Sequence, residues 1–544
     1  MKAFNKKIFG IFLIFALFLI DAKGQQTNWL WANSVGEIFF SETGRSIDID
    51  LNGNIFVVGY FQSPSITFGN FILQNADQTG YSYDIFIVKY SPTGNVLWAK
   101  RAGGNTWDEG YGVCTDSYGN AIITGRFQSD SITFDNYTLI NEGGSDIFLT
   151  KFDPMGNVIW AKRNGGNSFE RGYAVNTDAD DNILLTGMFF SPSIVFGNDT
   201  IVRSGNNDDV FIAKYDSSGN PLWARSAQDA VSNGVSTDAQ GNIVMSGWFN
   251  GTTITFDNNV LTNTSNSSDI FIVKYDAYGN VLWAKSAGGT NEDKCIGITI
   301  DAYGNTFITG FFKSSSIIFG NDTLTNVYYT GYVNDVFVAK YDSLGNVVWA
   351  KSTGGTGGDE GWSIDTDVSG NVWITGFTNN TDILIAAYNT IGNLILIDSV
   401  GTSNGGQMGY GIKSDGSGNL FLTGWYNSPT IAFGTNILNN SDNTGNSSDI
   451  YVAKLNYVVT TLHESHNLMT TNIFPNPFSN QLTFTFSDNI QTTVFLYNFF
   501  GQQVLQQTFT NTMVINTAQL ASGIYFYELR SDKQIIAIGK VVKY

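Results

Sequence analysis

The sequence predicts an all-β fold built from repeated four-stranded units, followed by a separate small β-sandwich. Three observations predict it. The phrase Asp-Ile-Phe-Ile-Val-Lys-Tyr starts at Asp84 and returns unchanged at Asp269. Short apolar stretches alternate with turns rich in Gly, Asn and Asp, and no long stretch shows helical periodicity. After about Tyr457 the repeat stops and another pattern begins. A fixed internal period is typical of a repeat architecture.

The first 24 residues are typical of a secretory signal peptide. Three lysines precede the apolar run Ile8–Ile20, and Ala22-Lys-Gly24 offers a small-residue cleavage site. The run is too short for a membrane span in the mature protein, and no other segment is apolar enough. We therefore predict a mature chain that begins at Gln25 and has no transmembrane segment.

Three marker residues each occur seven times before Tyr457. The first is a tryptophan that Leu396 replaces in the last copy: Trp31, Trp98, Trp160, Trp223, Trp283, Trp349. The second ends a strand: Gly59, Gly125, Gly187, Gly247, Gly310, Gly376, Gly424. The third begins one: Asp84, Asp146, Asp209, Asp269, Asp335, Asp382, Asp449. The final tryptophan-position spacing is only 47 residues, and we attribute it to a missing hairpin in the sixth copy.

Each copy predicts four strands, which in the second copy are Gly112–Asp116, Ala121–Arg126, Asp146–Phe152 and Val158–Lys162. Asp-x-x-Gly-Asn turns join the first strand to the second and the third to the fourth. Asp at the start of such a turn and Gly at its left-handed position favour tight hairpins. Four antiparallel strands repeated radially are the blades of a β-propeller.

The ends of the repeat region predict a closed ring. The chain enters with a lone fourth strand at Trp29–Asn33 and leaves with a third strand, Asp449–Leu455, that lacks a fourth. The N-terminal strand can complete the last blade, whereas an open array would need capping units. We therefore predict a seven-bladed β-propeller over residues 25–457, closed by the N-terminal strand.

The repeated phrases resemble the bacterial SBBP (seven-bladed β-propeller) repeat family. The resemblance rests on Asp-Ile-Phe-Ile-Val-Lys-Tyr, Asp-x-x-Gly-Asn and Ile-Thr-Gly, and covers about Trp29 to Tyr457. It implies the propeller fold and little about activity, because propellers host unrelated functions.

The turns joining strands one–two and three–four lie on one face of such a propeller, and the longer, variable connections lie on the other. Variable loops on a rigid scaffold are where binding is usually built. Aromatic rings there can stack on sugars, and carboxylates can accept hydroxyl hydrogen bonds. The candidate ligand-binding residues are Trp107, Asp108, Glu109, Phe169, Glu170, Glu292, Asp293, Asp359, Glu360 and Trp362. Solvated Gly-rich loops, with aromatics packed between blades, explain the same residues without a ligand.

Two turns resemble the start of a calcium loop and make Ca²⁺ the one cofactor to consider. Both place oxygen-bearing residues at alternate positions and Gly at the sixth. The candidate ligands are Asp48, Asp50 and Asn52 in one turn and Asp365, Asp367 and Ser369 in the other. Neither turn has Glu at the twelfth position, so we interpret the shared pattern first as turn chemistry and keep Ca²⁺ as the alternative.

Composition excludes several classes of function. A net charge of −19 repels phosphate backbones, which argues against a nucleic-acid partner. The two histidines, His463 and His466, lie beyond the repeats, so no Ser-His-Asp triad or histidine-rich metal site can form in the blades. Cys114 and Cys295 fall at non-equivalent repeat positions, and we predict buried free thiols.

Residues 458–471 read as a polar linker and 472–544 as an Ig-like β-sandwich. The expected strands are Gln481–Ser487, Thr493–Asn498, Gln503–Thr510, Gly523–Arg530 and Gln534–Val542. Several ordered motifs here resemble the type A sorting domain of the type IX (Por) secretion system. Its matching residues are Pro475, Asn476, Pro477, Gly501, Leu520, Gly523, Tyr525, Lys540 and Lys543. The resemblance implies contact with that secretion machinery and export to the surface or exterior of a Bacteroidetes-type cell.

Together these features predict an exported propeller that binds an extracellular glycan or surface protein without catalysis. A carboxylate-dependent, polysaccharide-degrading enzyme is the first alternative, because paired acids such as Asp108/Glu109 are present. A structural or adhesive surface module is the second.

Overall fold

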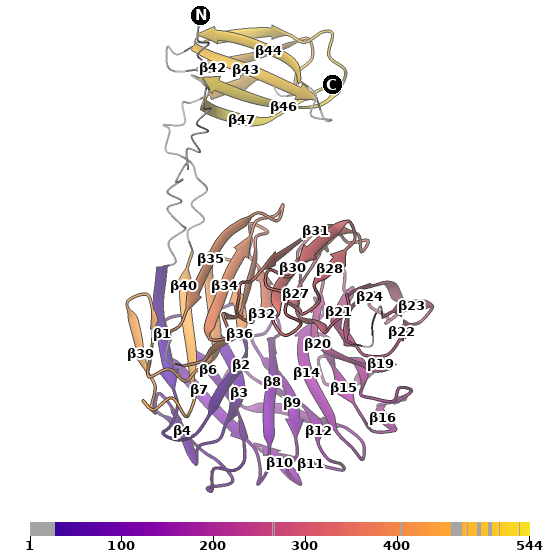
Figure 1. Cartoon of the computed structure of the whole chain (residues 1–544), viewed down its shortest axis with the longest axis vertical. Helices are drawn as coiled ribbons and strands as arrows, with labels where there is room; N and C mark the ends of the chain where they lie inside the picture. Colours follow the sequence, from indigo (N-terminus) through magenta and orange to yellow (C-terminus); the bar gives the residue numbers. More distant parts are fainter. Residues whose placement is uncertain are drawn as a thin grey trace, which may run out of the picture. The chain divides into compact units, whose positions relative to one another are not determined.

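A computed structural model describes residues 28–457, except 264, 266, 403 and 404, and residues 471–544, except 476, 487–490, 499–502, 511, 532 and 533. The signal-peptide prediction, the two histidines and all but the last residue of the predicted linker lie outside these ranges. Every named element in the described part is a β-strand, which confirms the all-β prediction. The chain divides into two compact units, Met1–Val458 and Val459–Tyr544 (Figure 1).

Within its described residues, the first unit contains seven four-stranded antiparallel sheets, which we number 1 to 7 in chain order. The first strands are β2 (Glu42–Ile49), β8 (Asp108–Thr115), β14 (Glu170–Thr177), β20 (Ala230–Thr237), β26 (Asp293–Ile300), β32 (Glu360–Thr366) and β36 (Gln407–Ser414). The second strands are β3 (Ile55–Phe61), β9 (Ala121–Phe127), β15 (Ile183–Phe189), β21 (Ile243–Phe249), β27 (Thr306–Phe312), β33 (Val372–Thr378) and β37 (Asn419–Tyr426).

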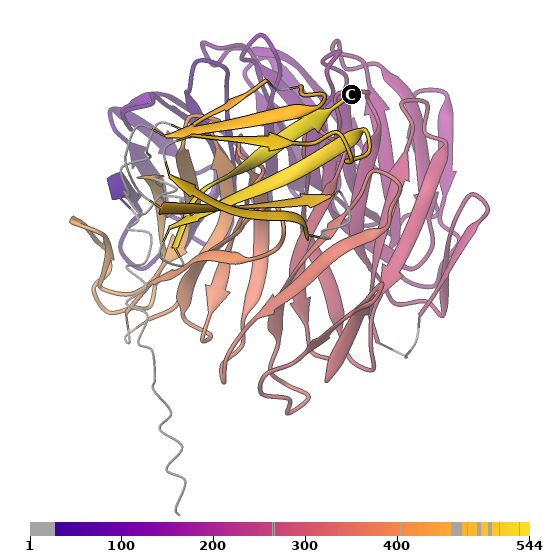
Figure 2. The same ribbon diagram turned by 90° about the horizontal axis from the view of Figure 1, so that it is seen from above.

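The third strands are β6 (Asp84–Tyr90), β12 (Asp146–Phe152), β18 (Asp209–Tyr215), β24 (Asp269–Tyr275), β30 (Asp335–Tyr341), β34 (Asp382–Tyr388) and β40 (Asp449–Asn456). The fourth strands of sheets 1 to 6 are β7 (Val96–Ala102), β13 (Val158–Asn164), β19 (Pro221–Ala227), β25 (Val281–Ala287), β31 (Val347–Thr353) and β35 (Leu394–Val400). In Figure 2 the colours pass from indigo through magenta to orange around this unit, so the sheets follow one another in chain order.

The fourth strand of sheet 7 comes from the start of the chain. β1 (Asn28–Val35) pairs antiparallel with β40, with Trp29 opposite Leu455 and Val35 opposite Ile450. Figure 1 shows the indigo β1 beside the orange β40. On the inner side, β2 packs against β8 of sheet 2 and also against β36 of sheet 7. The first sheet therefore has a neighbouring sheet on each side, as sheets 2 to 6 have.

The repeated turns hold each hairpin in one conformation. In sheet 2, the Asp116 carboxylate accepts hydrogen bonds from the N–H groups of Tyr118 (3.0 Å) and Asn120 (2.9 Å). Gly119 takes a left-handed conformation with φ of 76°, which residues with a side chain adopt at a cost. The sequence Asp-x-x-Gly-Asn thus specifies the turn through its own side chains and backbone.

The repeated Trp and Lys residues connect neighbouring sheets. Trp98 Nε1 and Lys89 Nζ of sheet 1 both donate to the Pro154 carbonyl oxygen in the β12–β13 turn of sheet 2, at 3.1 and 3.2 Å. Trp31 Nε1 and Lys454 Nζ of sheet 7 donate in the same way to Pro92 of sheet 1, each at 3.3 Å. The contact between the last and first sheets therefore uses the same bonds as the contact between sheets 1 and 2.

Six sheets carry an extra two-stranded hairpin between their second and third strands. The hairpins are β4 (Ser65–Phe68) with β5 (Phe71–Gln74), β10 (Ser131–Phe134) with β11 (Tyr137–Ile140), β16 (Ser193–Phe196) with β17 (Asp199–Val202), β22 (Thr253–Phe256) with β23 (Asn259–Thr262), β28 (Ser316–Phe319) with β29 (Asp322–Thr325), and β38 (Thr430–Phe433) with β39 (Asn436–Asn439). In sheet 6, β33 and β34 are joined by residues 379–381 alone, which accounts for the short spacing in that repeat.

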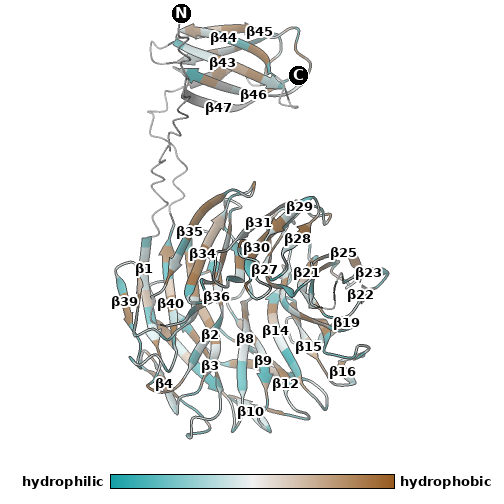
Figure 3. Ribbon diagram, in the orientation of Figure 1, coloured by the Kyte–Doolittle hydropathy of each residue, from teal (hydrophilic) through white to brown (hydrophobic). Residues whose placement is uncertain are grey.

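The core of the first unit lies between successive sheets. One cluster joins Ile147 and Trp160 of sheet 2 to Leu185, Phe211 and Tyr215 of sheet 3, all buried. Central strands are apolar over most of their length because both faces are covered. Figure 3 colours β34 mostly brown, and its sequence contains the run Ile383–Ala387.

The second unit has two antiparallel sheets around one core. One contains β41 (Thr471–Phe474), β42 (Gln481–Phe486) and β45 (Thr512–Asn516), and the other β44 (Gln503–Thr510), β43 (Gln491–Asn498), β46 (Gly523–Ser531) and β47 (Gln534–Lys543). Phe484 and Leu496, from different sheets, are both fully buried in the shared core. β41 and β45 are additional to the five strands expected from the sequence.

Candidate functional site

The first strands start earlier than the sequence predicted. Asp108 and Glu109 were assigned to a loop, but they lie in β8, opposite Phe127 and Arg126 of β9. Glu170, Asp293 and Glu360 begin strands in the same way. The loop assignment was wrong because the glycines that follow belong to the strand. A Cβ on Gly110 would approach the Val58 side chain to 2.6 Å, so Gly is required there for close packing.

Four of the predicted ligand-binding acids hold the backbone. Asp108 is fully buried, and its carboxylate accepts hydrogen bonds from the N–H groups of Gly104 (2.8 Å) and Gln128 (2.9 Å). Glu170, Asp293 and Asp359, each at most 1% exposed, accept equivalent bonds from Gly166, Gly289 and Gly355. These carboxylates fix the turn entering each first strand and are not presented to a ligand.

Three further candidates lie at the rim of the same face. Trp107 is 48% exposed and donates from Nε1 to the Tyr81 carbonyl oxygen, while Phe169 is 49% exposed. Glu292 forms ion pairs with Lys294 and Lys313. The aromatic rings are available to a partner, whereas the Glu292 charge is already compensated.

A β-bulge interrupts every first strand at the same repeat position. At each bulge the pairing skips one residue. The skipped residues are Arg45, Tyr111, Tyr173, Asn233, Ile296, Trp362 and Tyr410. Bulges redirect side chains and are common next to functional sites. We call these seven residues the bulge ring.

The bulge ring lines two neighbouring hollows, which share five of its residues. The inner one, which we call the central cavity, has a volume of about 190 Å³, and residues of all seven first strands line it. The outer one, which we call the mouth, has about 290 Å³ and is lined by Arg45, Tyr60, Glu109, Tyr111, Arg171, Tyr173, Asn233, Trp248 and Trp362. The mouth lies towards the long-loop face. The first strands begin at that face, and the mouth residues Glu109 and Arg171 lie between the start of their strand and its bulge.

Only Trp362 of the bulge ring was a sequence candidate. The missed signal is a variable residue between two small ones at a fixed repeat position: Gly44-Arg-Ser46, Gly110-Tyr-Gly112, Gly172-Tyr-Ala174, Ser232-Asn-Gly234, Cys295-Ile-Gly297, Gly361-Trp-Ser363 and Gly409-Tyr-Gly411. Small flanking residues allow the backbones to approach, and the central residue is free to vary.

Arg45 is packed among aromatic rings. Its guanidinium carbon lies 4.0 Å from the Tyr410 ring centre and 5.5 Å from the ring centres of Tyr111 and Trp362. A cation over an aromatic face is attracted by the ring quadrupole. These contacts orient the guanidinium without occupying its N–H donors.

Both remaining candidate acids have protein partners. Glu109 accepts bonds from Arg126 Nε and the Tyr111 hydroxyl. Glu360 accepts bonds from Trp362 Nε1 at 3.0 Å and Asn334 Nδ2 at 2.6 Å. Burial nevertheless raises the pKa of Glu360 above its ordinary value. Glu109 and Trp362 therefore line the mouth directly, whereas Glu360 bonds to Trp362 without lining the mouth itself.

A groove between sheets 3 and 4 continues from the mouth. It has a volume of about 450 Å³ and is lined by Phe169, Arg171, Tyr173, Met188, Phe190, Asp208, Val231, Trp248 and Asn250. Arg171, Tyr173 and Trp248 belong to both hollows. Because Phe169 lines the groove, this predicted rim residue belongs to a surface that is continuous with the mouth.

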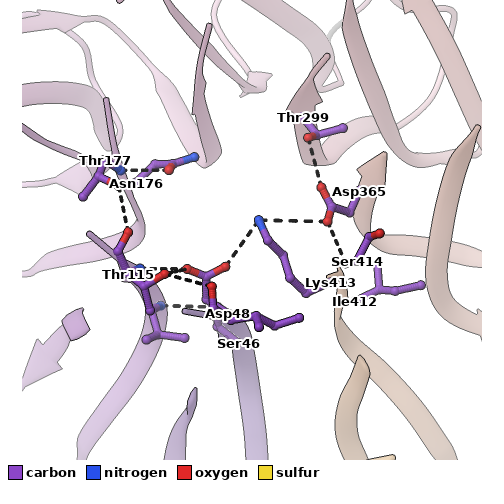
Figure 4. Close-up of polar contacts among 12 residues, drawn as sticks. Ser46, Asp48, Thr115, Asn176, Thr177, Thr299, Asp365, Ile412, Lys413 and Ser414 are labelled. Atoms are coloured by element: carbon purple, nitrogen blue, oxygen red, sulfur yellow. Dashed lines mark hydrogen bonds and ion pairs between the residues drawn. The ribbon is translucent and has the colours of Figure 1, made fainter. Parts of the chain in front are cut away.

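The opposite end of the first strands carries the calcium candidates. Lys413 Nζ lies 3.3 Å from Asp48 and 4.0 Å from Asp365 (Figure 4). Asp48 also accepts bonds from the Thr115 N–H and hydroxyl, and Asp365 from the Ser414 N–H. These acids therefore neutralise a lysine and bond to neighbouring strands.

The turn acids are occupied as well. Asp50 bonds to the N–H groups of Asn52 and Asn54 and pairs with Lys89 at 3.2 Å, and Asp367 bonds to the Ser369 N–H and to Tyr457. Among the described residues, no group of three or more His, Cys, Asp or Glu is arranged to hold a metal ion. The shared pattern is explained as turn chemistry.

The sorting-motif residues form local contacts in the second unit. The Tyr525 hydroxyl donates to the Ala521 carbonyl oxygen at 2.8 Å, and Lys543 Nζ donates to that of Thr517. Leu520 packs on the core. Asn476 and Gly501 lie outside the described residues, as does the side chain of Lys540.

Comparison with known families identifies the second unit. Residues 472–544 match the secretion system C-terminal sorting domain, which confirms the predicted resemblance. This domain implies export to the extracellular or cell-surface space. No helix in the described ranges has the length and apolarity of a membrane span.

Comparisons of the whole chain give distant relatives. An uncharacterized WD repeat-containing protein of Acanthamoeba polyphaga mimivirus is 25% identical over 433 residues, which cover 64% of this chain and 31% of that protein. The regulatory protein FlaEY of Caulobacter vibrioides is 32% identical over 111 residues, or 20% of this chain and 12% of that protein. The chain therefore spans less than a third of the length of either curated relative.

Solved propeller structures align with the chain at low TM-scores and low sequence identity. The Dos1 propeller aligns with a TM-score of 0.40 at 8% identity, covering 79% of this chain and 96% of that one. The WD40 domain of Toxoplasma gondii coronin aligns with a TM-score of 0.38 at 8% identity, covering 80% and 87%. The protein is an all-β, propeller-like chain with a type IX secretion sorting domain.

Proposed function

We propose that this protein is an exported, closed seven-bladed β-propeller of the SBBP-repeat type that binds an extracellular glycan, or a surface protein, without catalysis. Binding takes place at the mouth and the adjoining groove. The observation that carries the proposal is the bulge ring, which gathers Tyr, Trp and Arg side chains around one hollow. Aromatic faces and a few convergent polar groups are the usual lining of a ligand site.

The shape of this surface favours an extended ligand. The mouth holds about 290 Å³, and the groove adds a surface that leads outward past Phe169 and Phe190. A ligand with its terminal unit in the mouth and its following units along the groove would occupy both hollows. Tyr and Trp offer large rigid contact areas with polar tips, as binding surfaces for glycans and proteins require.

The test compares Trp362→Ala with Trp107→Ala in the full-length exported protein, against a glycan array and a panel of surface proteins. Trp362 lines the mouth, whereas Trp107 is an aromatic residue at the rim of the same face. We expect Trp362→Ala to weaken binding by roughly 10-fold or more, as removal of a buried aromatic anchor does. Equal effects from both variants would contradict a site at the mouth.

A carboxylate-dependent hydrolase is the second candidate, because burial raises the pKa of Glu360 beside an aromatic wall. A raised pKa is what a general acid needs, and a second carboxylate would have to lie nearby. Release of reducing sugar from polysaccharides by wild type, abolished in Glu360→Gln, would favour this function. Its absence across a broad panel would favour binding alone.

A further inference from the structure

Arg45 stands apart from most arginines of this unit. Arg101, Arg126 and Arg163 each lie within 2.7 Å of a carboxylate oxygen. Among the described residues, Arg45 has no carboxylate within 4 Å and donates no hydrogen bond. Glu109, which also lines the mouth, interacts with Arg45 electrostatically but lies beyond ion-pair distance, so the guanidinium can still pair with a ligand that supplies a carboxylate.

The geometry prepares the Arg45 guanidinium for such a ligand. Three aromatic rings hold it at the mouth, with the nearest ring centre 4.0 Å away. A guanidinium presents its N–H donors in a planar fork that matches a carboxylate, and aromatic stacking leaves that fork free.

Other polar groups at the mouth also lack partners. Arg171 Nε and Asn233 Oδ1 are buried and have no hydrogen-bond partner within the described residues. A buried polar atom without a partner is costly, and both residues line the mouth, so a ligand that draws these two side chains towards its hydroxyl groups would relieve that cost. The nearby Glu109 carboxylate is bonded to Arg126 and Tyr111, which reduces its repulsion of an anion.

We propose that the mouth recognises an acidic sugar, a pyranose whose carboxylate binds Arg45 and whose ring stacks against Tyr111 or Trp362. This inference rests on the proposed glycan-binding function and names its ligand class. A volume of about 290 Å³ is at the low end of ligand sites, which suits one terminal sugar unit. The neighbouring groove would contact the following units.

The experiment measures affinities of the full-length exported protein for oligomers of galacturonate, glucuronate and mannuronate. Each oligomer is compared with its methyl ester, which keeps the sugar and removes the charge. The variants are Arg45→Gln, Arg45→Lys and the control Arg225→Gln. Arg225 lies on the outer strand β19 and stacks on Trp223, so its loss removes the same charge away from the mouth.

We expect wild type and Arg225→Gln to bind at least one acidic oligomer roughly 10- to 100-fold more tightly than its ester, as a charge-assisted hydrogen-bond pair provides. Arg45→Gln should abolish that difference, and Arg45→Lys should keep part of it. Should Arg45→Gln fail to fold, the wild-type comparison of acid with ester still shows whether the carboxylate of the sugar contributes to binding.

Four outcomes would overturn the inference. Equal affinity of wild type for acid and ester, or an unchanged preference in Arg45→Gln, removes the role of Arg45 and leaves glycan binding standing. Binding of neutral glycans alone does the same. Absence of binding to every glycan, with capture of a surface protein at the mouth, would remove the glycan class itself.

Discussion

The two turns of sheet 2 offer a matched test of what the repeated phrase contributes to stability. Asp116 and Asp153 both start an Asp-x-x-Gly-Asn turn, and each accepts two backbone N–H bonds and one Asn side-chain bond. They differ in one respect. Asp116 is fully buried as a side chain and pairs with Lys151 at 2.8 Å, whereas Asp153 is partly exposed and has no lysine partner within ion-pair distance among the described residues.

The magnitude follows from that difference. Asp153→Ala removes a partly exposed turn cap, and we expect a loss of about 1 kcal/mol. Asp116→Ala also leaves the Lys151 ammonium, 6% exposed, without its counter-charge, which costs ~3–5 kcal/mol for a buried pair. The bond from Lys151 Nζ to the Ser217 carbonyl oxygen at 3.1 Å remains, so we expect the lower end of that range.

Denaturant unfolding followed by tryptophan fluorescence measures both variants. All 12 tryptophans lie before residue 426, so the signal reports the first unit alone. A double variant, Asp116→Ala with Lys151→Met, should recover much of the loss, because an apolar replacement of both partners removes the unpaired charge. Equal losses in Asp116→Ala and Asp153→Ala, or no recovery in the double variant, would refute the reasoning.

Three further predictions concern pH, thiols and export. Burial raises the pKa of Glu42 to about 8 and that of Asp293 to about 6. Between the ordinary carboxyl pKa near 4 and these values the folded state binds more protons, so stability should fall as pH rises from about 5 to 9, and Glu42→Gln should flatten the curve. Cys114 and Cys295 are buried free thiols, so a thiol reagent should label neither in the native protein and both after unfolding; labelling of one without unfolding would contradict their burial. Deletion of residues 472–544 should leave the protein in the periplasm, measured by cell fractionation, and unchanged secretion would contradict the sorting role.

The sequence predicted strands best where side chains specify the hairpin. Asp146–Phe152 matches β12 residue for residue, because the strand begins at a marker Asp and ends at an Asp-x-x-Gly-Asn turn. Its neighbour was misjudged: β8 begins at Asp108, four residues before the expected Gly112. A glycine that allows close packing at a bulge cannot be distinguished in the sequence from a glycine in a loop, so the start of β8 was predicted as loop.

The site was harder to predict for the same reason. Trp362 was chosen as a loop residue, and the structure places it in the bulge ring. Arg45 and Tyr410 were missed, because a single variable residue between two small ones carries no pattern within one repeat. Alignment of all seven repeats at the bulge would have exposed it. Most of the candidate acids are held by burial and backbone hydrogen bonds, and neither property is visible in the sequence.

The most direct test of the account is an experimental structure of the full-length protein bound to its best glycan ligand from the array. The account predicts seven four-stranded blades, with β1 as the outer strand of the last, and ligand density in the mouth against Trp362 and Arg45. Ligand density on the face of the Asp-x-x-Gly-Asn turns, with the mouth unchanged, would contradict it.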